Sequence, residues 1–425
     1  MQHSSEIYRN YLKILNEELI PAMGCTEPIA IAYAGAAARQ LLGKLPDRVV
    51  IEASGNIIKN VKSVIVPNTG SMHGIPAAAG AGIIFGRAER VLEVISEATE
   101  EQQKELEEFL RDVPCEVKLT EDGPVFDIIV SVYAGDESAR VRIAEAHTNI
   151  VLLEKNGEII KEVPVSNDSE TWSEDRSCLS VEGIYDFAES VDIADVKELL
   201  DRQIGYNYAI SEEGIRGDYG ANIGRTIMRR EHVSLREKCI AMAAAGSDAR
   251  MNGCELPVII NSGSGNQGIT VSVPVIVYAR EAGCPDEQLY RALVLSNLIS
   301  IYQKTEIGRL SAFCGAVNAG ASAGCGIAYL KHHSLTHIKH TLVNALAVSS
   351  GIICDGAKAS CAGKIAVSVE TGLLGLEMYE NGQQFFGGDG ILKKGADNVV
   401  HNVGQLGREG MRETDREILK IMLKI

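Results

Sequence analysis

Aromatic residues and long apolar runs are both scarce in this sequence. Phe, Trp and Tyr make up 5% of the 425 residues, with a single Trp, whereas Gly occurs 42 times. This balance predicts closely packed helices and backbone-lined pockets, without the aromatic platforms on which bases stack. No apolar stretch approaches the roughly 20 residues that span a bilayer, and the N-terminal segment is too charged for a signal peptide. We therefore expect a cytoplasmic protein with no membrane partner.

Positive charge is also in deficit. The chain has 41 Lys and Arg residues against 57 Asp and Glu residues, a formal net charge of −16. Such acidity favours solubility and argues against binding to nucleic acid or to anionic membranes. A small anionic substrate stays compatible, because it needs only local positive potential. The proportions of hydrophobic (45%) and charged (23%) residues are those of ordinary globular domains.

The ten cysteines of the chain include no CxxC pair. That absence excludes, at the level of motifs, a structural zinc ribbon and a ferredoxin-type cluster site. A disulfide framework is not expected in a cytoplasmic chain of this size either. The cysteines are therefore buried small hydrophobes, or they bind metal or take part in chemistry.

The first part of the chain mixes helical and strand patterns. Residues 6–20 predict an amphipathic helix, and residues 48–67 predict two strands around a turn at 54–56. Helices are expected at 75–88 and 89–112. Short alternating strands joined by hairpin turns follow, up to about residue 165.

The second part of the chain is helical in pattern. The polar, acidic segment 166–177 predicts a linker or an exposed loop, and from about residue 180 onward nearly every apolar pattern has helical spacing. Runs of strands and of helices within one domain indicate an α+β class. We predict an α+β N-terminal domain over residues 1–190, followed by an all-α catalytic domain over residues 191–425.

Three cysteines of the helical part form the strongest candidate site. Cys314, Cys354 and Cys361 are spaced by 40 and 7 residues, and each has small neighbours that let thiolates crowd around an inorganic centre. Two interpretations stay open, namely buried core thiols and a three-cysteine iron–sulfur site. Three ligands would leave one iron of a [4Fe–4S] cluster open as a Lewis acid. Cys325 lies nearby in an apolar run and is assigned to the core.

Cys25 is the second candidate. It precedes Thr26 and Pro28, residues that suit a helix N-terminus. At such a position the helix dipole favours a thiolate, which could act as a base, a nucleophile or a ligand. A buried cysteine at the start of an Ala-rich helix is the alternative.

Two loops offer hydrogen-bond donors to an anion. Residues 263–268, GSGNQG, match the GxGxxG pattern, which predicts either a dinucleotide site or a backbone nest for a substrate carboxylate. Residues 68–76 follow a predicted strand and carry Asn68, Thr69 and His73, which suit an anion or a general acid, or form a plain turn. A lone His147 after a strand pattern is more often structural.

Taken together, the motifs resemble those of the L-cysteine desulfidases, a bacterial family with many uncharacterised members that is related to the iron–sulfur-dependent L-serine dehydratases. The shared features are the three cysteines 314, 354 and 361, GCTEP at 24–28, SGN at 54–56, NTGxxHG at 68–74, HTN at 147–149, GDYGANIGR at 217–225 and GSGNQG at 263–268. The resemblance covers nearly the whole chain.

The resemblance implies a fold like that of the serine dehydratase alpha chain. It also implies which reaction the protein catalyses. The reaction is the α,β-elimination of L-cysteine to pyruvate, ammonia and sulfide, with a [4Fe–4S] cluster and without pyridoxal phosphate. It implies Cys314, Cys354 and Cys361 as cluster ligands and Cys25 as the catalytic cysteine. The expected substrate contacts are Ser54, Asn56, Asn68, Thr69, His73, His147, Ser264, Gly265 and Asn266.

Three other functions stay open at this point. Serine dehydratases have a Ser-rich, His-containing loop in place of GCTEP and a longer gap between the last two ligands, so the sequence favours cysteine over serine. An NAD-dependent oxidoreductase would use GSGNQG as its phosphate loop. A non-catalytic iron–sulfur sensor would use the cysteines alone. The expected partner is an amino-acid substrate, and a homodimer is the assembly considered.

Overall fold

The structure is a computed structural model that describes residues 1, 5–120, 123–165, 174–308 and 310–423. The first half of the chain contains α1 (Glu6–Glu18), β1 (Pro21–Met23), α2 (Thr26–Leu42), β2 (Arg48–Ala53), α3 (Gly55–Val61), α4 (Gly74–Phe85), η1 (Ala88–Glu93), α5 (Glu100–Asp112), β3 (Cys115–Leu119), β4 (Asp127–Ala134), β5 (Glu137–Ala144), β6 (Ile150–Lys155) and β7 (Glu158–Glu162).

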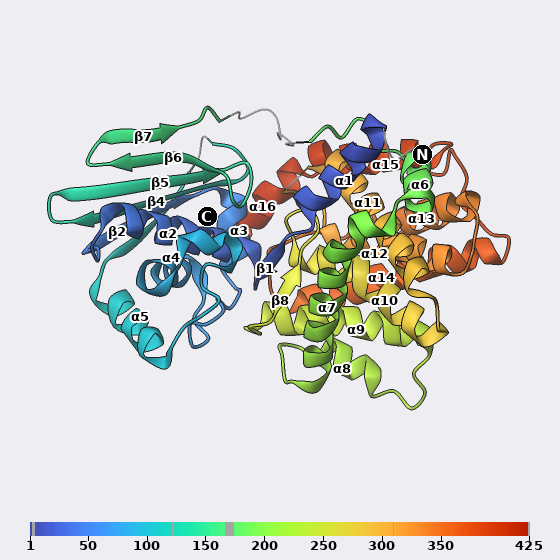
Figure 1. The fold of residues 1–425 in the computed structure, drawn as a ribbon, viewed down its shortest axis with the longest axis horizontal. Coiled ribbons are helices and arrows are strands. Elements are labelled where there is room, and N and C mark those ends of the chain that lie inside the picture. Colours follow the sequence, from blue (N-terminus) through green and yellow to red (C-terminus); the bar gives the residue numbers. More distant parts are fainter. Residues whose placement is uncertain (2–4, 121–122, 166–173, 309, 424–425) are drawn as a thin grey trace.

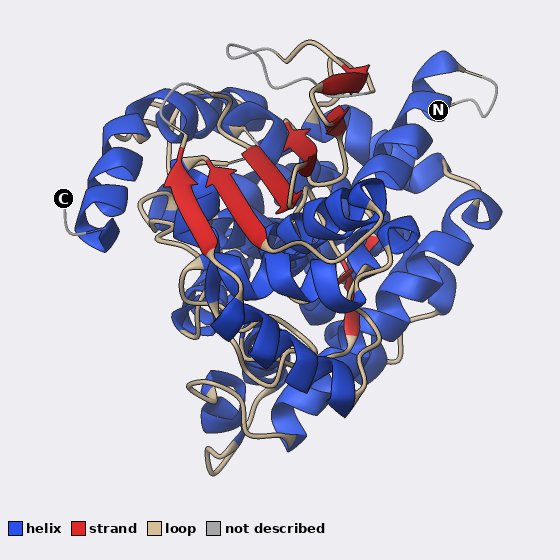
Figure 2. Ribbon diagram, turned by 90° about the vertical axis from the view of Figure 1, so that its left-hand side faces the viewer, coloured by secondary structure: helices blue, strands red, loops and turns tan. Residues whose placement is uncertain are grey.

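The second half contains α6 (Val181–Ser190), α7 (Ile193–Arg216), α8 (Ile223–Met228), α9 (Leu235–Met251), β8 (Pro257–Ile259), α10 (Gly265–Ala282), α11 (Asp286–Ile307), α12 (Gly315–Leu330), α13 (Leu335–Ser349), α14 (Ser360–Glu380), α15 (Ala396–Gln405), η2 (Leu406–Gly410) and α16 (Arg412–Leu423). The chain therefore has a sheet-containing N-terminal region and a mostly helical C-terminal part (Figures 1 and 2). Over the described residues, no helix is both long and apolar enough to cross a bilayer.

The N-terminal sheet has six strands in the order β3-β2-β4-β5-β6-β7. β2 pairs with β3 in parallel, and the other pairings are antiparallel. α2 and α4 pack together below the sheet in Figure 1, and α2 contacts β4 and β5 directly. The hairpin strands predicted up to residue 165 are confirmed as β3–β7. Alternating residues such as Ile128, Val130 and Val132 are fully buried, as expected for one face of a strand.

One predicted strand is wrong. The sequence after Ser54 was expected to return as a second strand, but it forms the short helix α3. Ile57 and Val61 are four residues apart and both fully buried. A helix places that spacing on a single face, whereas a strand would need apolar residues at every second position. This helix carries Asn56 and Asn60 toward the helical part of the molecule.

The helical part is built around α12, which packs against α10, α11, α13 and α14. The helices approach closely because small residues face each other. A Cβ added to Gly320 of α12 would lie 2.3 Å from the backbone of Ser368 in α14. The sequence prediction of closely packed helices is thereby confirmed, with the three-residue β8 as a departure from a purely helical second domain.

Two segments near the ends of the chain join the two parts. The side chains of Tyr8, Tyr11, Ile14 and Leu15 in α1 are buried in the core of the helical part, and β1 pairs antiparallel with β8. The chain therefore begins on the helical part before it enters the sheet region. The division at residue 190 stays a prediction, and most of the predicted linker 166–177 lies outside the described residues.

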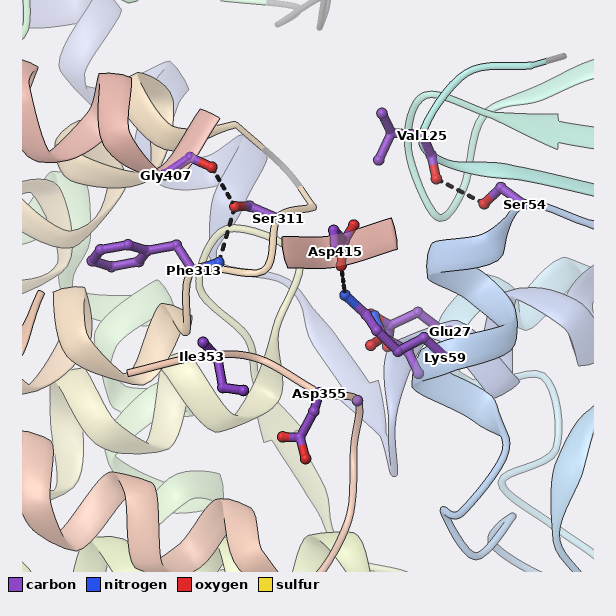
Figure 3. Close-up of polar contacts among 12 residues, drawn as sticks. Glu27, Ser54, Lys59, Val125, Ser311, Phe313, Ile353, Asp355, Gly407 and Asp415 are labelled. Atoms are coloured by element: carbon purple, nitrogen blue, oxygen red, sulfur yellow. Dashed lines mark hydrogen bonds and ion pairs between the residues drawn. The ribbon is translucent and has the colours of Figure 1, made fainter. Parts of the chain in front are cut away.

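At the other end, α16 returns to the sheet region and contacts α3. Lys59 of α3, with 2% of its side chain exposed, forms an ion pair with Asp415 of α16 (Figure 3). We expect Asp415→Asn to lower the free energy of unfolding by about 3 kcal/mol, because it leaves a buried ammonium without its counter-charge. Chemical denaturation measures the loss, and amide exchange should rise in α16.

Glu413→Gln is the matched control, since Glu413 also lies on α16 but pairs with Arg416 in an exposed position. It should change stability by less than ~0.5 kcal/mol. Equal effects of the two substitutions would contradict a structural role for the buried pair.

The GDYGANIGR motif owes its conformation to a buried carboxylate. Asp248 of α9 is fully buried, and its Oδ2 accepts a hydrogen bond from the backbone N–H of Gly224 at 3.0 Å. Burial raises the pKa of Asp248 to about 6. A carboxyl with a raised pKa adds stability below its unfolded pKa of about 3.9 and loses that contribution as the pH rises through its folded pKa.

We therefore expect the stability of the wild-type protein to contain a decrease of about 3 kcal/mol between roughly pH 4 and pH 6 that Asp248→Asn removes. Urea unfolding measured across this range tests the expectation. Asp218→Asn, at an exposed carboxylate of the same motif, should keep the wild-type pH profile. A profile of Asp248→Asn that matches wild type would show that another group titrates.

Candidate functional site

A cavity of about 110 Å³ lies where the sheet region meets the helical part. The sheet region contributes residues of α2, α3 and the β5–β6 connection, and the helical part contributes the 262–267 loop, the 310–316 segment and the 354–365 segment. Its principal lining residues are Cys25, Thr26, Glu27, Asn56, Asn60, His147, Arg250, Ser262, Ser264, Asn266, Gln267, Lys304, Ser311, Cys314, Cys354 and Cys361. The cavity therefore contains the principal cysteines singled out in the sequence.

The three distant cysteines of the helical part meet here. Cys314 occupies the N-cap of α12, and Cys361 lies in the first turn of α14. A short antiparallel bridge holds the loop of Cys354 beside that of Cys314. In it, the Cys314 N–H donates to Ile352 O at 3.0 Å and the Cys354 N–H donates to Ala312 O at 2.6 Å. The backbone thus fixes two of the three thiols relative to each other.

The three thiols are the residues that could hold an iron–sulfur cluster. Within the described parts of the chain, no three His, Cys, Asp or Glu side chains are arranged to hold one ion. The ligands of a cluster lie farther apart, because each thiolate binds a different iron. Burial and the neighbouring Cys354 raise the pKa of Cys314 to about 12, so a bound metal must displace its proton. The donor set, three thiols on one wall of a cavity, fits an iron–sulfur cluster.

Positive potential converges on the cavity from several helices. Cys25, Ser264 and Cys314 are the N-cap residues of α2, α10 and α12, and all three line it. Each helix N-terminus carries a partial positive charge and free N–H groups. Thiolates, inorganic sulfide and carboxylates are all stabilised in such a place.

Cys25 forms a hydrogen bond with a buried carboxylate. Its Sγ donates to Glu27 Oε2 at 3.1 Å, and Asn60 Nδ2 donates to Glu27 Oε1 at 2.9 Å. Burial and the charge of Glu27 raise the pKa of Cys25 well above its usual value, although Arg250 opposes them. The expectation that the helix dipole favours a Cys25 thiolate is therefore wrong for the resting site, because burial and Glu27 outweigh the dipole.

Glu27 itself is held in its ionised form. Burial acts to raise the pKa of Glu27, but the nearby His147 and the hydrogen bonds from Cys25 and the backbone bring it below its ordinary value. Thr26 Oγ1 also lies 3.1 Å from Glu27 Oε2. The resting pair is a thiol that donates to a carboxylate, which places a proton acceptor directly beside Cys25.

Several predicted substrate contacts lie in the cavity and others do not. Asn56, His147, Ser264 and Asn266 line it. Gly265 is outside the lining and begins α10. The remaining predicted contacts are Ser54, Asn68, Thr69 and His73.

These four side chains are absent from the lining. Ser54 Oγ donates to Val125 O at 2.7 Å (Figure 3), Asn68 donates to Ile95 O at 2.8 Å, and Thr69 donates to Val66 O at 2.7 Å. His73 lies in a separate surface hollow beside Pro76 and Arg111. Their placement gives no support to substrate contact, because the first three shape the backbone near α3 and α4 and His73 faces another surface.

The sequence analysis missed seven polar residues of the cavity, namely Glu27, Asn60, Arg250, Ser262, Gln267, Lys304 and Ser311. Glu27 stands inside the GCTEP motif, so its place in the motif was an available signal. Arg250 is 3% exposed in a helix of small residues. A basic residue inside an Ala-rich buried pattern was the signal there. Gln267 stands inside the GSGNQG motif, which was its signal. Asn60 and Lys304 carry no local signal, since only tertiary packing brings them to the site.

The GSGNQG loop does not form a dinucleotide site. It joins β8 to α10, but β8 has three residues and pairs antiparallel with β1 in a two-stranded sheet. A dinucleotide fingerprint requires a parallel βαβ unit. The prediction that these residues give an NAD-dependent oxidoreductase is therefore wrong.

Comparison with known proteins gives matches over the whole chain. The family model described as serine dehydratase alpha chain matches residues 89–420. A UPF0597 protein of Desulfitobacterium hafniense is 55% identical over 423 residues, which cover 100% of this chain and 98% of that protein. UPF0597 proteins of Lachnoclostridium phytofermentans and Treponema denticola are 49% and 46% identical, each over 98% of this chain and over 100% and 98% of their own lengths.

Proposed function

This chain belongs to the serine dehydratase alpha chain family, and we propose that it is an iron–sulfur lyase that eliminates the β-substituent of a small amino acid, with L-cysteine as substrate. The observation that carries the proposal is the meeting of Cys314, Cys354, Cys361 and Cys25 at one buried cavity. Four thiols from distant parts of the chain line this one cavity, which is more than core packing requires.

The proposed cofactor is a [4Fe–4S] cluster held by Cys314, Cys354 and Cys361, with no pyridoxal phosphate. When bound, a cluster with three protein ligands supplies a Lewis acid that helps the substrate's sulfur or oxygen leave. The chain's own contribution is a setting in which anionic ligands are stable, because the N-termini of α12 and α14 lie at Cys314 and Cys361.

Proton transfer is assigned to Cys25 and its partner Glu27. The Cys25 Sγ faces the cavity from the sheet region, while the three other thiols face it from the helical part. In the resting site Glu27 Oε2 accepts a hydrogen bond from that Sγ, and the raised pKa of Cys25 and the lowered pKa of Glu27 keep the proton on the sulfur. Asn60 holds the second carboxylate oxygen, which fixes the orientation of Glu27. Cys25 can act as the base only after it has lost this proton, and its thiolate then removes the substrate's Cα proton.

Cysteine is favoured over serine by the GCTEP loop, which places a thiol and a carboxylate in the cavity. The alternative substrate is L-serine, and one specific observation favours it: the matching family model is described as a serine dehydratase chain. The chemistry of both reactions is the same elimination, and they differ only in the leaving group.

Comparative turnover by protein purified and reconstituted without oxygen tests the proposal. L-Cysteine should give pyruvate and sulfide in equal amounts, with kcat/KM at least about tenfold above that for L-serine, because cysteine presents the softer donor to iron. A reversed preference would identify a serine dehydratase. Absence of pyruvate from both amino acids, with the cluster in place, would overturn the proposal.

A further inference from the structure

Arg250 is a buried cation whose hydrogen-bonding capacity is largely unused. It lies near the end of α9, is 3% exposed and lines the cavity. Its Nη1 donates to Asn266 Oδ1 at 3.3 Å, a long contact. Nε and Nη2 are buried and no oxygen or nitrogen of the described residues lies within hydrogen-bond distance of them, although the Cys25 thiol lies near enough to interact with the guanidinium. Burying a guanidinium with unused N–H donors costs free energy, unless a bound ligand accepts hydrogen bonds from them.

The two unpartnered atoms form one edge of the guanidinium, the edge that binds a carboxylate through two parallel hydrogen bonds. Other arginines of this chain show that mode. Arg142 donates from Nε and Nη2 to the two oxygens of Asp127 at 2.7 and 2.9 Å. Arg236 donates in the same way to Glu370 at 2.9 and 2.6 Å. In both cases a carboxylate fills the edge that Arg250 leaves open.

The nearest carboxylate does not fill it. Glu27 interacts electrostatically with Arg250, but its Oε2 accepts from Cys25 and its Oε1 accepts from Asn60. Glu27 therefore balances part of the charge without occupying the open edge. Arg250 is the guanidinium of the lining, and its Nε and Nη2 still offer two N–H groups to the cavity. The cavity thus has room and charge for one more anion.

Gly265 makes this placement of Arg250 possible. A Cβ at residue 265 would lie 2.2 Å from Arg250 Nε and 2.6 Å from its Cζ. The first turn of α10 therefore packs directly on the guanidinium. A helix N-terminus and a cation repel each other, and an anion that contacts both from the cavity side would stabilise both.

We propose that Arg250 binds the carboxylate of the amino-acid substrate through Nε and Nη2, with the first turn of α10 as the second donor surface. The inference rests on the proposed function for the identity of that substrate. The side chains of Ser54, Asn68 and Thr69 donate their hydrogen bonds elsewhere. Arg250 takes their place as the residue that gives specificity for a carboxylate. Arg250 thereby holds the α-carbon in the cavity that Cys25 and the three thiols line.

The test uses cluster-loaded protein and a pair of probes that differ only in the carboxylate, L-alanine and L-alaninamide, neither of which has a leaving group. Anaerobic titration calorimetry should show that wild type binds L-alanine at least about tenfold more tightly than the amide. Arg250→Lys keeps the charge but loses the two-point geometry. It should weaken L-alanine binding by about ten- to hundredfold and leave L-alaninamide binding unchanged.

Gly265→Ala provides a second route to the same result if Arg250→Lys does not fold. The added methyl group must displace the guanidinium, so this variant should also lose discrimination between acid and amide. Arg142→Lys is the matched control, because its edge is already filled by Asp127 outside the cavity. It should bind L-alanine as wild type does, and iron content should be equal in all proteins compared.

The outcomes separate this inference from the proposed function. Binding of L-alanine that depends on Arg250, without turnover of cysteine or serine, would support the carboxylate site and count against the lyase. Turnover of cysteine with the same KM in wild type and iron-loaded Arg250→Lys would support the lyase and overturn the carboxylate site. Equal affinity of wild type for L-alanine and its amide would overturn it as well.

Discussion

Serine in place of Cys354 should remove iron from the protein and abolish turnover while leaving the fold intact. The same result is expected for Cys314→Ser and Cys361→Ser, because a hydroxyl is a poor ligand for iron and each thiol would hold a different iron. Iron content should fall by more than about half in each variant. Circular dichroism should show wild-type helical content, since Cys354 lies in a loop and the other two residues lie at helix starts.

Cys325→Ala provides the control for loss of a cysteine. Cys325 is fully buried within α12 and its Sγ contacts Ile338 O at 3.7 Å, outside the cavity lining. This variant should keep its iron and its turnover and lose roughly 1 kcal/mol of stability. Full iron content in any of the three serine variants would remove that residue from the ligand set.

Alanine in place of Cys25 should leave iron in the protein and lower kcat by about 10²–10⁴-fold, the range expected for loss of a general base. The physical reason is position: Cys25 comes from the sheet region, lines the same cavity as the three proposed ligands, and donates a hydrogen bond to Glu27. Cys25→Ser should be nearly as inactive, because a hydroxyl is far less acidic than a thiol. Steady-state kinetics with measured iron content checks both variants.

Two results would contradict this role. Loss of iron from Cys25→Ala would make Cys25 a ligand of the resting cluster that the substrate must displace. Wild-type kcat in an iron-loaded Cys25→Ala protein would assign the base elsewhere, with His147, a lining residue, as the next candidate. Cys239→Ala is the control, since Cys239 is fully buried in α9 outside the lining.

Most of the architecture could be predicted from local patterns. The strand alternation of residues 115–162 and the helical spacing beyond residue 180 describe β3–β7 and α6–α16 well. The prediction failed for α3, because a short apolar pattern of four-residue spacing resembles a strand until its partner is known. The sequence pattern could not show that α1 packs on the helical part, because that arrangement depends on contacts between residues far apart in the chain.

Site residues of an unusual type could be predicted from the sequence. Common residues that belong to the site only because of their position in the fold could not. Cysteines with small neighbours, and the Ser264–Asn266 loop, stood out in the sequence, and the structure brings them to one cavity. Ser54, Asn68 and Thr69 looked equally suitable as donors, yet the backbone uses their hydrogen bonds. Arg250 stands in an Ala-rich pattern, but only its burial at the cavity, with two N–H groups left open, identifies it as a binding residue.

Iron and inorganic sulfide, determined together on protein purified without oxygen, test the central claim most directly. The account predicts about four irons and four sulfides per chain, with the visible absorption of a cluster, and loss of both on exposure to air together with loss of pyruvate formation. Protein that contains no iron and still converts L-cysteine to pyruvate would contradict it.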